Sequence, residues 1–351
     1  MVVGPDGALP LPWLARPLVS ALATQRSHAL LVLGSEGVGV LPFALTLAQA
    51  WLCEAAQRKA GPCGRCGSCR LVQSHLHPDL QVLMPERLRR EHDWLRVDDK
   101  ADADDNKRKP SKQIRIDEVR SVIDWVYKTN ARGQGKVVLM HPAEALNPQA
   151  ANALLKTLEE PPAGTRILLT CADPALLLPT VRSRCQKLPL AAPAAAEATA
   201  WLTARGVAQP EVLLAACGGR PLDAWAMAQA GVQAEHWRAL PAAVAQGQAG
   251  ALAGWPLPRV LDALLKLCHD AMATATGAPA HYFPAGSVSA GASLQSLAAW
   301  AQELRRVAQH DDHPWNEALM LDALLAAGAR ALRRSTATPV AATQGFDTLP
   351  S

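Results

Sequence analysis

The sequence lacks the features of an exported or membrane-spanning protein. Its first residues, MVVGPDGALPLPW, contain no basic stretch that leads into an apolar one, so we expect no secretory signal. No run of apolar residues approaches the roughly 18 that a membrane-spanning helix needs. We therefore expect a cytoplasmic protein without a membrane partner.

The composition of a dedicated nucleic-acid-binding protein is also missing. The net charge is only +4 at pH 7, and apart from ten Trp the aromatic residues are two Tyr and three Phe. These numbers favour neither a strongly basic face nor a surface on which bases stack. With 49% hydrophobic and 19% charged residues, the 351-residue chain is typical of a globular protein with two or three domains.

Apolar runs alternate with helical patterns from Leu30 to about Leu190, which predicts a parallel α/β sheet. The expected strands are Ala29–Leu33, Leu80–Met84, Lys136–Met140 and Arg166–Thr170. The expected helices are Leu41–Arg58, Ile116–Lys128, Pro148–Glu159 and Pro179–Cys185. After Leu190 the strand signals cease, and an Ala-rich helical pattern continues to about Arg334.

Two segments carry little sign of a packed core. The charge-dense stretch at 86–112 predicts a solvated and partly disordered insertion, to which we assign no function. The polar, Pro-containing tail Ser335–Ser351 predicts a frayed end.

Four of the eight cysteines lie close together in the sequence, whereas the other four are scattered as buried cytosolic thiols would be. Cys63, Cys66 and Cys69 form two overlapping C-x-x-C pairs, and Cys53 precedes them by ten residues. This spacing predicts a closed, structural zinc site with four thiolate ligands. Free cysteines or an iron–sulfur cluster are the alternatives, and His75 or His77 could replace Cys53 as a ligand.

A glycine-rich stretch follows the first expected strand but lacks the residues that bind ATP. Gly34, Gly37 and Gly39 are spaced like a phosphate-binding loop, yet Val40 and Leu41 stand where lysine and Ser/Thr are needed. His141 and Pro142 occupy the positions of the acidic residues that complete a magnesium site, and Glu144 lies further along. We therefore expect a degenerate loop that binds no ATP.

Two long strings carry a specific resemblance. NALLKTLEEPP at 152–162 and LLTCADPALLLPTVRSRC at 168–185 resemble the clamp-loader branch of the AAA+ family, whose bacterial members have a cysteine knuckle after the loop helix. The resemblance implies a RecA-like AAA+ domain at 1–192 that carries the zinc module at 53–69. A small helical lid at 193–233 and a helical collar at 234–351 would follow.

The resemblance also implies a role for Arg184. Ser183, Arg184 and Cys185 match the family's Ser-Arg-Cys motif, whose arginine reaches the ATP held by a neighbouring subunit. A planar guanidinium suits this role because it can bind phosphate oxygens bidentately. The family's sensor threonines are replaced by Cys171 and Ala172, and its lid arginine by Leu222, with Arg220 a weak candidate nearby.

The implied neighbours are the ATP-hydrolysing tau/gamma subunits and the delta subunit of a clamp loader. The sliding clamp and primed DNA would be reached through the complex, and the chain would be part of the DNA-directed DNA polymerase holoenzyme. We expect no ATPase or polymerase site in this chain. The alternatives are a self-sufficient AAA+ ATPase with an unusual loop and a zinc-ribbon nucleic-acid-binding protein.

Overall fold

The computed structural model describes residues 2–55, 61–94, 110–309 and 316–333. It divides into two compact units, the first formed by Met1–Glu197 with Arg220–Leu222 and the second by Ala198–Gly219 with Asp223–Ser351. Among the described residues, no helix combines the length and the apolar character that crossing a bilayer requires.

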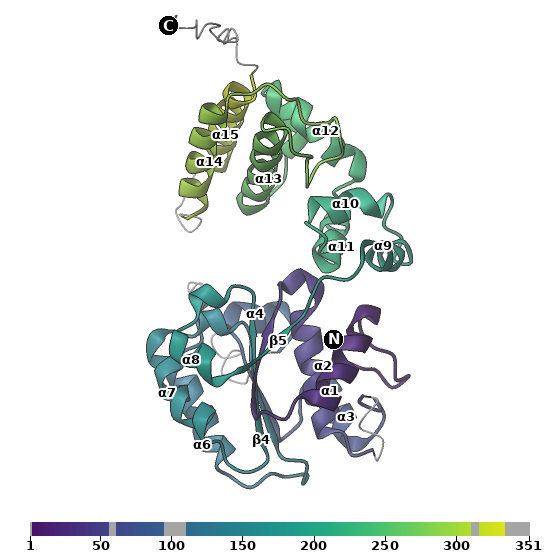
Figure 1. Ribbon diagram of the computed structural model, residues 1–351, viewed down its shortest axis with the longest axis vertical. Coiled ribbons are helices and arrows are strands. Elements are labelled where there is room, and N and C mark those ends of the chain that lie inside the picture. Colours follow the sequence, from purple (N-terminus) through teal and green to yellow (C-terminus); the bar gives the residue numbers. More distant parts are fainter. Residues whose placement is uncertain (1, 56–60, 95–109, 310–315, 334–351) are drawn as a thin grey trace, which may run out of the picture. The chain divides into compact units, whose positions relative to one another are not determined.

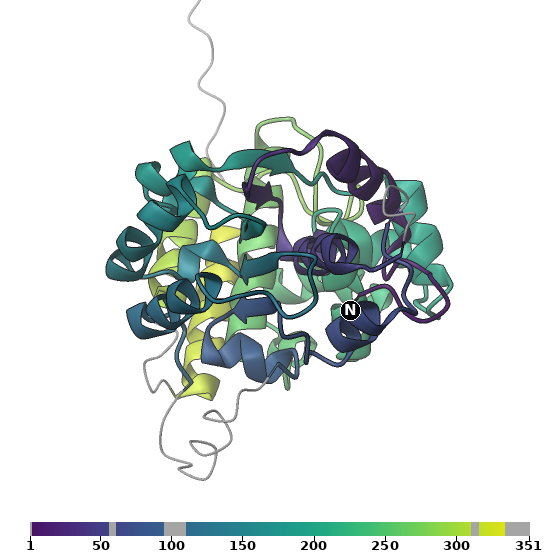
Figure 2. The ribbon, with the colours of Figure 1, turned by 90° about the horizontal axis from the view of Figure 1, so that it is seen from below.

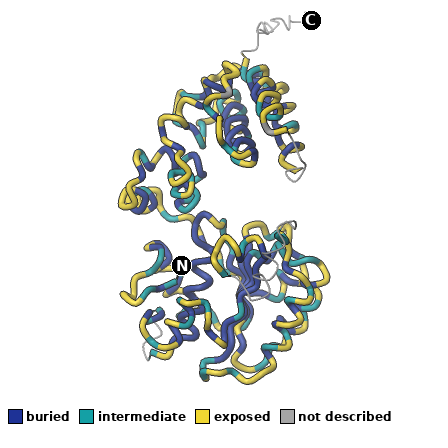
Figure 3. The backbone as a smooth tube through the Cα atoms, turned by 180° about the vertical axis from the view of Figure 1, so that it is seen from behind, coloured by how far each residue is buried: buried dark blue, intermediate teal, exposed yellow. Residues whose placement is uncertain are grey.

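The first unit is built on a parallel five-stranded sheet with the strand order β2-β3-β4-β1-β5 (Figure 1). Its strands are β1 (Ala29–Leu33), β2 (Leu80–Leu83), β3 (Lys136–Met140), β4 (Thr165–Cys171) and β5 (Gln186–Pro189). The three central strands are apolar and almost fully buried because helices cover both faces of the sheet (Figure 3).

Helices lie on the two faces of this sheet (Figure 1), and Figure 2 shows the same layers from below. One side holds α1 (Ala15–Thr24), α2 (Val40–Leu52) and α3 (Gly67–Gln73). The other side holds α6 (Ile116–Val126), α7 (Pro148–Glu159) and α8 (Pro179–Arg184). Alternate residues such as Leu31, Val138 and Leu169 join the core beneath α6, α7 and α8.

Beyond β5 the described elements are helical, as the sequence predicts. They are α9 (Ala195–Thr203), α10 (Pro210–Ala216), α11 (Pro221–Gln229), α12 (Ala234–Ala245), α13 (Leu257–Ala275), α14 (Leu294–Ala308) and α15 (Glu317–Ala331). The core of the second unit contains Trp237, whose ring stacks on Phe283 at 4.6 Å. The separate lid at 193–233 and collar at 234–351 stay predictions.

Three expectations about individual elements need correction. The strand β5 was not predicted, because its exposed Gln186 and Lys187 lack an apolar pattern. The helix expected over Leu41–Arg58 ends at Leu52, because Cys53 turns to an extended conformation, and residues 56–58 lie outside the described part. The start of the expected insertion at 86–112 is the helix α4 (Glu86–Glu91), on which Arg89 is buried and bound to Glu118.

Residues 95–109 and the tail at 335–351 lie outside the described residues.

A buried carboxylate on α13 fastens the loop that carries Phe283. Asp270 is fully buried and accepts hydrogen bonds from the N–H groups of His281, Tyr282 and Phe283 at 2.7 to 2.9 Å. Without this carboxylate, the buried N–H group of Phe283 and the N–H groups of the exposed His281 and half-buried Tyr282 would lose their acceptor.

We expect Asp270→Ala to lower the free energy of unfolding by about 1–3 kcal/mol, because the buried N–H group of Phe283 would be left without an acceptor. The control is Asp322→Ala on α15 of the same unit, since Asp322 is exposed. That change should cost less than about 0.5 kcal/mol. Urea unfolding followed by circular dichroism measures both, and equal losses would contradict the assignment.

Candidate metal centre, glycine-rich loop and exposed arginine

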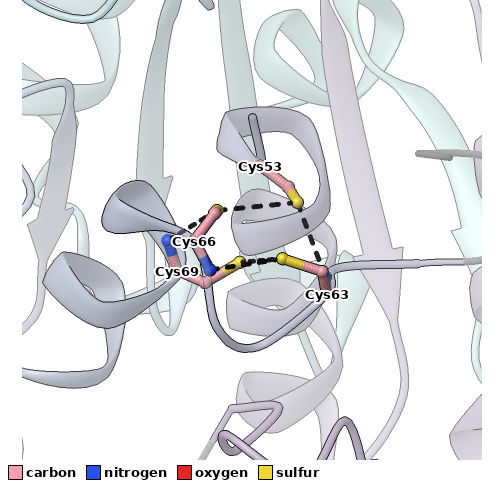
Figure 4. A group of neighbouring side chains, drawn as sticks. All are labelled: Cys53, Cys63, Cys66 and Cys69. Atoms are coloured by element: carbon pink, nitrogen blue, oxygen red, sulfur yellow. Dashed lines mark hydrogen bonds between the residues drawn. The ribbon is translucent and has the colours of Figure 1, made fainter. Parts of the chain in front are cut away.

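The four clustered cysteines converge on one point (Figure 4). Their Sγ atoms all lie within 4.8 Å of one another. The Sγ atoms of Cys53 and Cys66 are 3.9 Å apart, and so are those of Cys63 and Cys69. A disulfide would need about 2.05 Å. Four sulfurs around a tetrahedral zinc at about 2.3 Å would stand about 3.8 Å apart, so the cluster can hold a metal ion of this kind.

Local backbone geometry produces this convergence. Cys53 follows the end of α2, and Cys66 caps the start of α3. The N–H groups of Cys63, Cys66 and Cys69 point at the sulfurs of Cys53, Cys63 and Cys66, with N···S distances of 3.3 to 3.5 Å. Such N–H donors stabilise thiolates, which are the form that binds metal.

The thiols respond differently to their surroundings. Burial raises the pKa of Cys53 and of Cys69. Burial also acts on Cys63, but N–H groups of Arg65 and Cys66 outweigh it and lower the pKa of that thiol to about 6. Cys63 is therefore ready to ionise near neutral pH, whereas Cys53 and Cys69 would need the charge of the ion itself.

Polar side chains beside the cluster are already engaged with one another. Ser68 Oγ lies 3.1 Å from both Glu54 Oε1 and His77 Nε2, and Arg132 pairs with Glu54 at 2.7 Å. The other nitrogen of His77 accepts the N–H of Asp79. His75 stacks on Trp94 at 3.7 Å. The structure thus brings Cys53 to the cluster and gives both histidines other partners.

The segment from Cys53 to Gln73, here called the cysteine knuckle, also fastens the N-terminal segment. Gln73 Nε2 donates to the carbonyls of Val3 and Gly64, at 2.8 and 2.7 Å. Gln49 on α2 exchanges two hydrogen bonds with the backbone of Val3. A Cβ atom on Gly64 would lie 1.9 Å from the carbonyl oxygen of Gly4, so only glycine permits this approach.

Three N–H groups of the glycine-rich loop after β1 are bonded within the chain. The N–H groups of Val38 and Gly39 donate to the carbonyls of Ser35 and Glu36 at 3.2 and 2.9 Å, and that of Gly34 donates to Cys171. A phosphate-binding loop needs such donors turned toward the ligand. Here the loop closes on itself as a short 3-10 helix.

Apolar side chains cover the same loop. Leu11 is fully buried, and a Cβ atom on Gly39, whose φ is +96°, would lie 2.3 Å from its Cδ1 atom. The indole N–H of Trp13 donates to the carbonyl of Val38 at 2.8 Å. Val40 and Leu41 are buried in the first turn of α2. These contacts give the loop apolar neighbours where a nucleotide site would offer cationic ones.

The polar groups at the ends of β3 and β4 are engaged within the chain. His141 is buried with Nδ1 at 2.7 Å from Thr170 Oγ1, and burial lowers its pKa to about 4. Glu144 Oε1 accepts the N–H groups of Ala172 and Asp173 at 2.6 and 2.9 Å, so it fastens a loop. Burial and the nearby Glu144 raise the pKa of Cys171 to about 12.

A small cavity remains beside the loop. It measures about 190 Å³ and is lined by Gly34, Val40, His141 and Glu144 among others. Small-molecule sites usually measure about 300–1,000 Å³. The cavity is therefore small for a nucleotide.

The Ser-Arg-Cys motif lies at the end of α8. Cys185 is buried, which raises its pKa to about 11, and Ser183 Oγ donates to the carbonyl of Thr180 at 3.1 Å. The side chain of Arg184 is 31% exposed and forms an ion pair with Glu159, a residue that the sequence did not single out. Arg220 immediately precedes α11.

The sheet order and the glycine-rich turn after the inner strand β1 define a AAA+ protein of the α/β class. Residues 14–194 match the family model described as "DNA polymerase III, delta subunit". A delta-prime subunit of DNA polymerase III from Pseudomonas aeruginosa is 38% identical over 60% of this chain and 59% of its own length. The Escherichia coli K12 delta-prime subunit is 32% identical over 72% and 75%.

The chain belongs to the family of DNA polymerase III delta-prime subunits. The match to the Pseudomonas aeruginosa protein spans only about three fifths of that relative, 59% of its length. A DNA polymerase III tau subunit from Salmonella typhimurium is 33% identical over 47% of this chain and 22% of its own length.

Two glycines with the same backbone conformation offer a test of the knuckle. Gly64 and Gly133 have φ values of +71° and +73°, but nothing lies within 4 Å of a Cβ atom on Gly133. We expect Gly133→Ala to cost about 1 kcal/mol through left-handed strain alone. Gly64→Ala should cost about 1–3 kcal/mol more, through overlap with Gly4.

Urea unfolding measures both losses, and hydrogen exchange at Val3 should accelerate only in Gly64→Ala. Equal losses and unchanged exchange would show that the knuckle does not hold the N-terminal segment.

Proposed function

We propose that this chain is a non-hydrolysing subunit of the DNA polymerase III clamp loader that offers Arg184 to ATP bound by a neighbouring subunit. The observation that carries the proposal is a contrast within the first unit. The N–H groups of Gly34, Val38 and Gly39 in the loop are bonded within the chain, whereas the guanidinium of Arg184 lies at the surface.

Arginine suits a role in trans because its charge is permanent and its planar fork can stabilise the charge of a phosphoryl transition state. By family membership, the neighbours would be the tau/gamma ATPase subunits and the delta subunit. Together these cytoplasmic proteins would place the sliding clamp on primed DNA, with helices of the second unit serving as a collar.

We assign the four cysteines a structural zinc ion, held by Cys53, Cys63, Cys66 and Cys69. The sulfur separations and the N–H groups directed at the sulfurs support this assignment. Zinc would draw together the end of α2, the start of α3 and, through Gln73, the N-terminal segment. Its role would be to stabilise the fold.

The two alternative functions receive less support. A self-sufficient ATPase would need a cation and free N–H groups at the loop, where the structure places Val40, Leu41 and internal hydrogen bonds. A zinc-ribbon nucleic-acid-binding protein would present its knuckle to the ligand. Here Cys53 and Cys69 are buried, Gln73 binds the carbonyl of Val3, and Gly64 lies against Gly4.

The zinc assignment predicts one zinc ion per chain in metal analysis. Cys63→Ser should weaken zinc binding by more than about 100-fold, because even residues behind the ligands change affinity by about 10–100-fold. It should also lower the thermal unfolding midpoint. The control is Cys268→Ser, which removes a buried thiol in the second unit. Iron with visible absorbance would indicate a cluster instead, and a metal-free folded protein would exclude both.

The proposed role of Arg184 at a neighbour's ATP predicts that Arg184→Ala lowers the clamp-dependent ATPase of the reconstituted loader by about tenfold or more. Arg182→Ala is a matched control, since it removes a cation from the same helix. The isolated wild-type chain should bind no ATP in equilibrium dialysis. Unchanged turnover in Arg184→Ala, together with ATP binding by the isolated chain, would favour a self-sufficient ATPase.

A further inference from the structure

The surface arginine is not free, although its proposed role requires it to reach another molecule. Arg184 is the last residue of α8, and Glu159 is the last residue of α7. Arg184 Nε donates to Glu159 Oε1 at 2.5 Å, and Nη2 contacts the same oxygen. Nη1 donates to the carbonyl of Thr180 at 3.0 Å. All three guanidinium nitrogens of Arg184 therefore have partners within the chain.

The edge formed by Nε and Nη2 is one that binds an oxyanion bidentately. The carboxylate of Glu159 already binds that edge, so phosphate oxygens can bind there only after the ion pair has opened. We infer that Glu159 is a positioning residue that holds Arg184 away from the neighbour's nucleotide and competes with phosphate for the guanidinium. This inference rests on the proposed function of Arg184.

The ion pair between Arg184 and Glu159 can open and close reversibly because both side chains are exposed to water. The side chains of Arg184 and Glu159 are 31% and 48% exposed. Exposed ion pairs bias a side chain by only about two- to fivefold and are screened by salt. A phosphate with several negative charges can therefore displace Glu159 without disturbing the fold.

The pair is not required to attach α8 to α7. Leu154 and Leu158 of α7 and Val181 of α8 are buried in the same apolar core, which joins the two helices. Removing the charge of Glu159 should consequently leave the thermal unfolding midpoint almost unchanged. A role limited to packing would predict the opposite.

The next residue gives a matched control. Glu160 is exposed and makes no ion pair with another described residue. Glu159→Gln and Glu160→Gln remove the same charge from adjacent positions. A difference between the two variants therefore reports on the contact with Arg184 and not on net charge.

The first arm of the test uses the isolated chain and does not depend on any partner. Phenylglyoxal modifies accessible arginines, and peptide mass spectrometry follows the reaction at Arg184. Glu159→Gln should raise the modification rate about two- to fivefold, whereas Glu160→Gln should leave it unchanged. Equal rates in the wild type and Glu159→Gln would overturn the inference.

The second arm uses the reconstituted loader before clamp and primed DNA are added. Glu159→Gln should lower the KM for ATP or raise the basal ATPase by about two- to fivefold, with Glu160→Gln as the control. The double variant Glu159→Gln/Arg184→Ala should show no gain. A fall in turnover toward that of Arg184→Ala would mean that Glu159 supports the arginine, which overturns the inference.

The two arms separate the two possible failures. If Arg184→Ala leaves the loader unaffected, the proposed function fails, whatever the modification rates are. If Arg184→Ala lowers turnover while Glu159→Gln changes neither the modification rate nor the ATPase, only the inference about Glu159 fails.

Discussion

The complete burial of α2 determines much of the first unit. All thirteen residues of this helix are buried between the sheet and its neighbours, and a helix covered on every side has no face for an unpaired charge. Its first turn therefore holds Val40 and Leu41. Gln49 on its body binds the backbone of Val3, and Cys53 beyond its end joins the sulfur cluster. The apolar loop, the anchored N-terminal segment and the cysteine knuckle all depend on one buried helix.

Elements with strong local signals could be predicted from the sequence. β1 and β3 are continuous apolar runs because both faces of the sheet are covered, and their ends agree with the predicted ones. α7 starts where Asn147 caps the first turn and proline follows. β5 lies at a sheet edge, where Gln186 and Lys187 remain exposed, so its sequence carries no such pattern.

The candidate sites could be predicted only where the residues that form them stand close together in the sequence. The C-x-x-C spacing places thiolates on one knuckle, and the cysteines do converge. Glycine spacing does not reveal whether the loop N–H groups face a ligand, and the carbonyls of Ser35 and Glu36 accept them here. Glu159 and Arg184 stand in separate sequence motifs, and only the packing of α7 against α8 makes them partners.

The position of Arg184 explains how its guanidinium can be bound within the chain and still exchange that partner for phosphate. The C-terminal end of a helix carries partial negative charge, and here the carbonyl of Thr180 and the carboxylate of Glu159 add to it. In water this attraction is screened, so the ion pair stays weak. If a neighbouring subunit covers the site, the lower dielectric constant strengthens the attraction between the guanidinium and any anion. The attraction to a multiply charged phosphate then increases more than the attraction to a single carboxylate. The same geometry can therefore retain the arginine in the free chain and release it in an assembly.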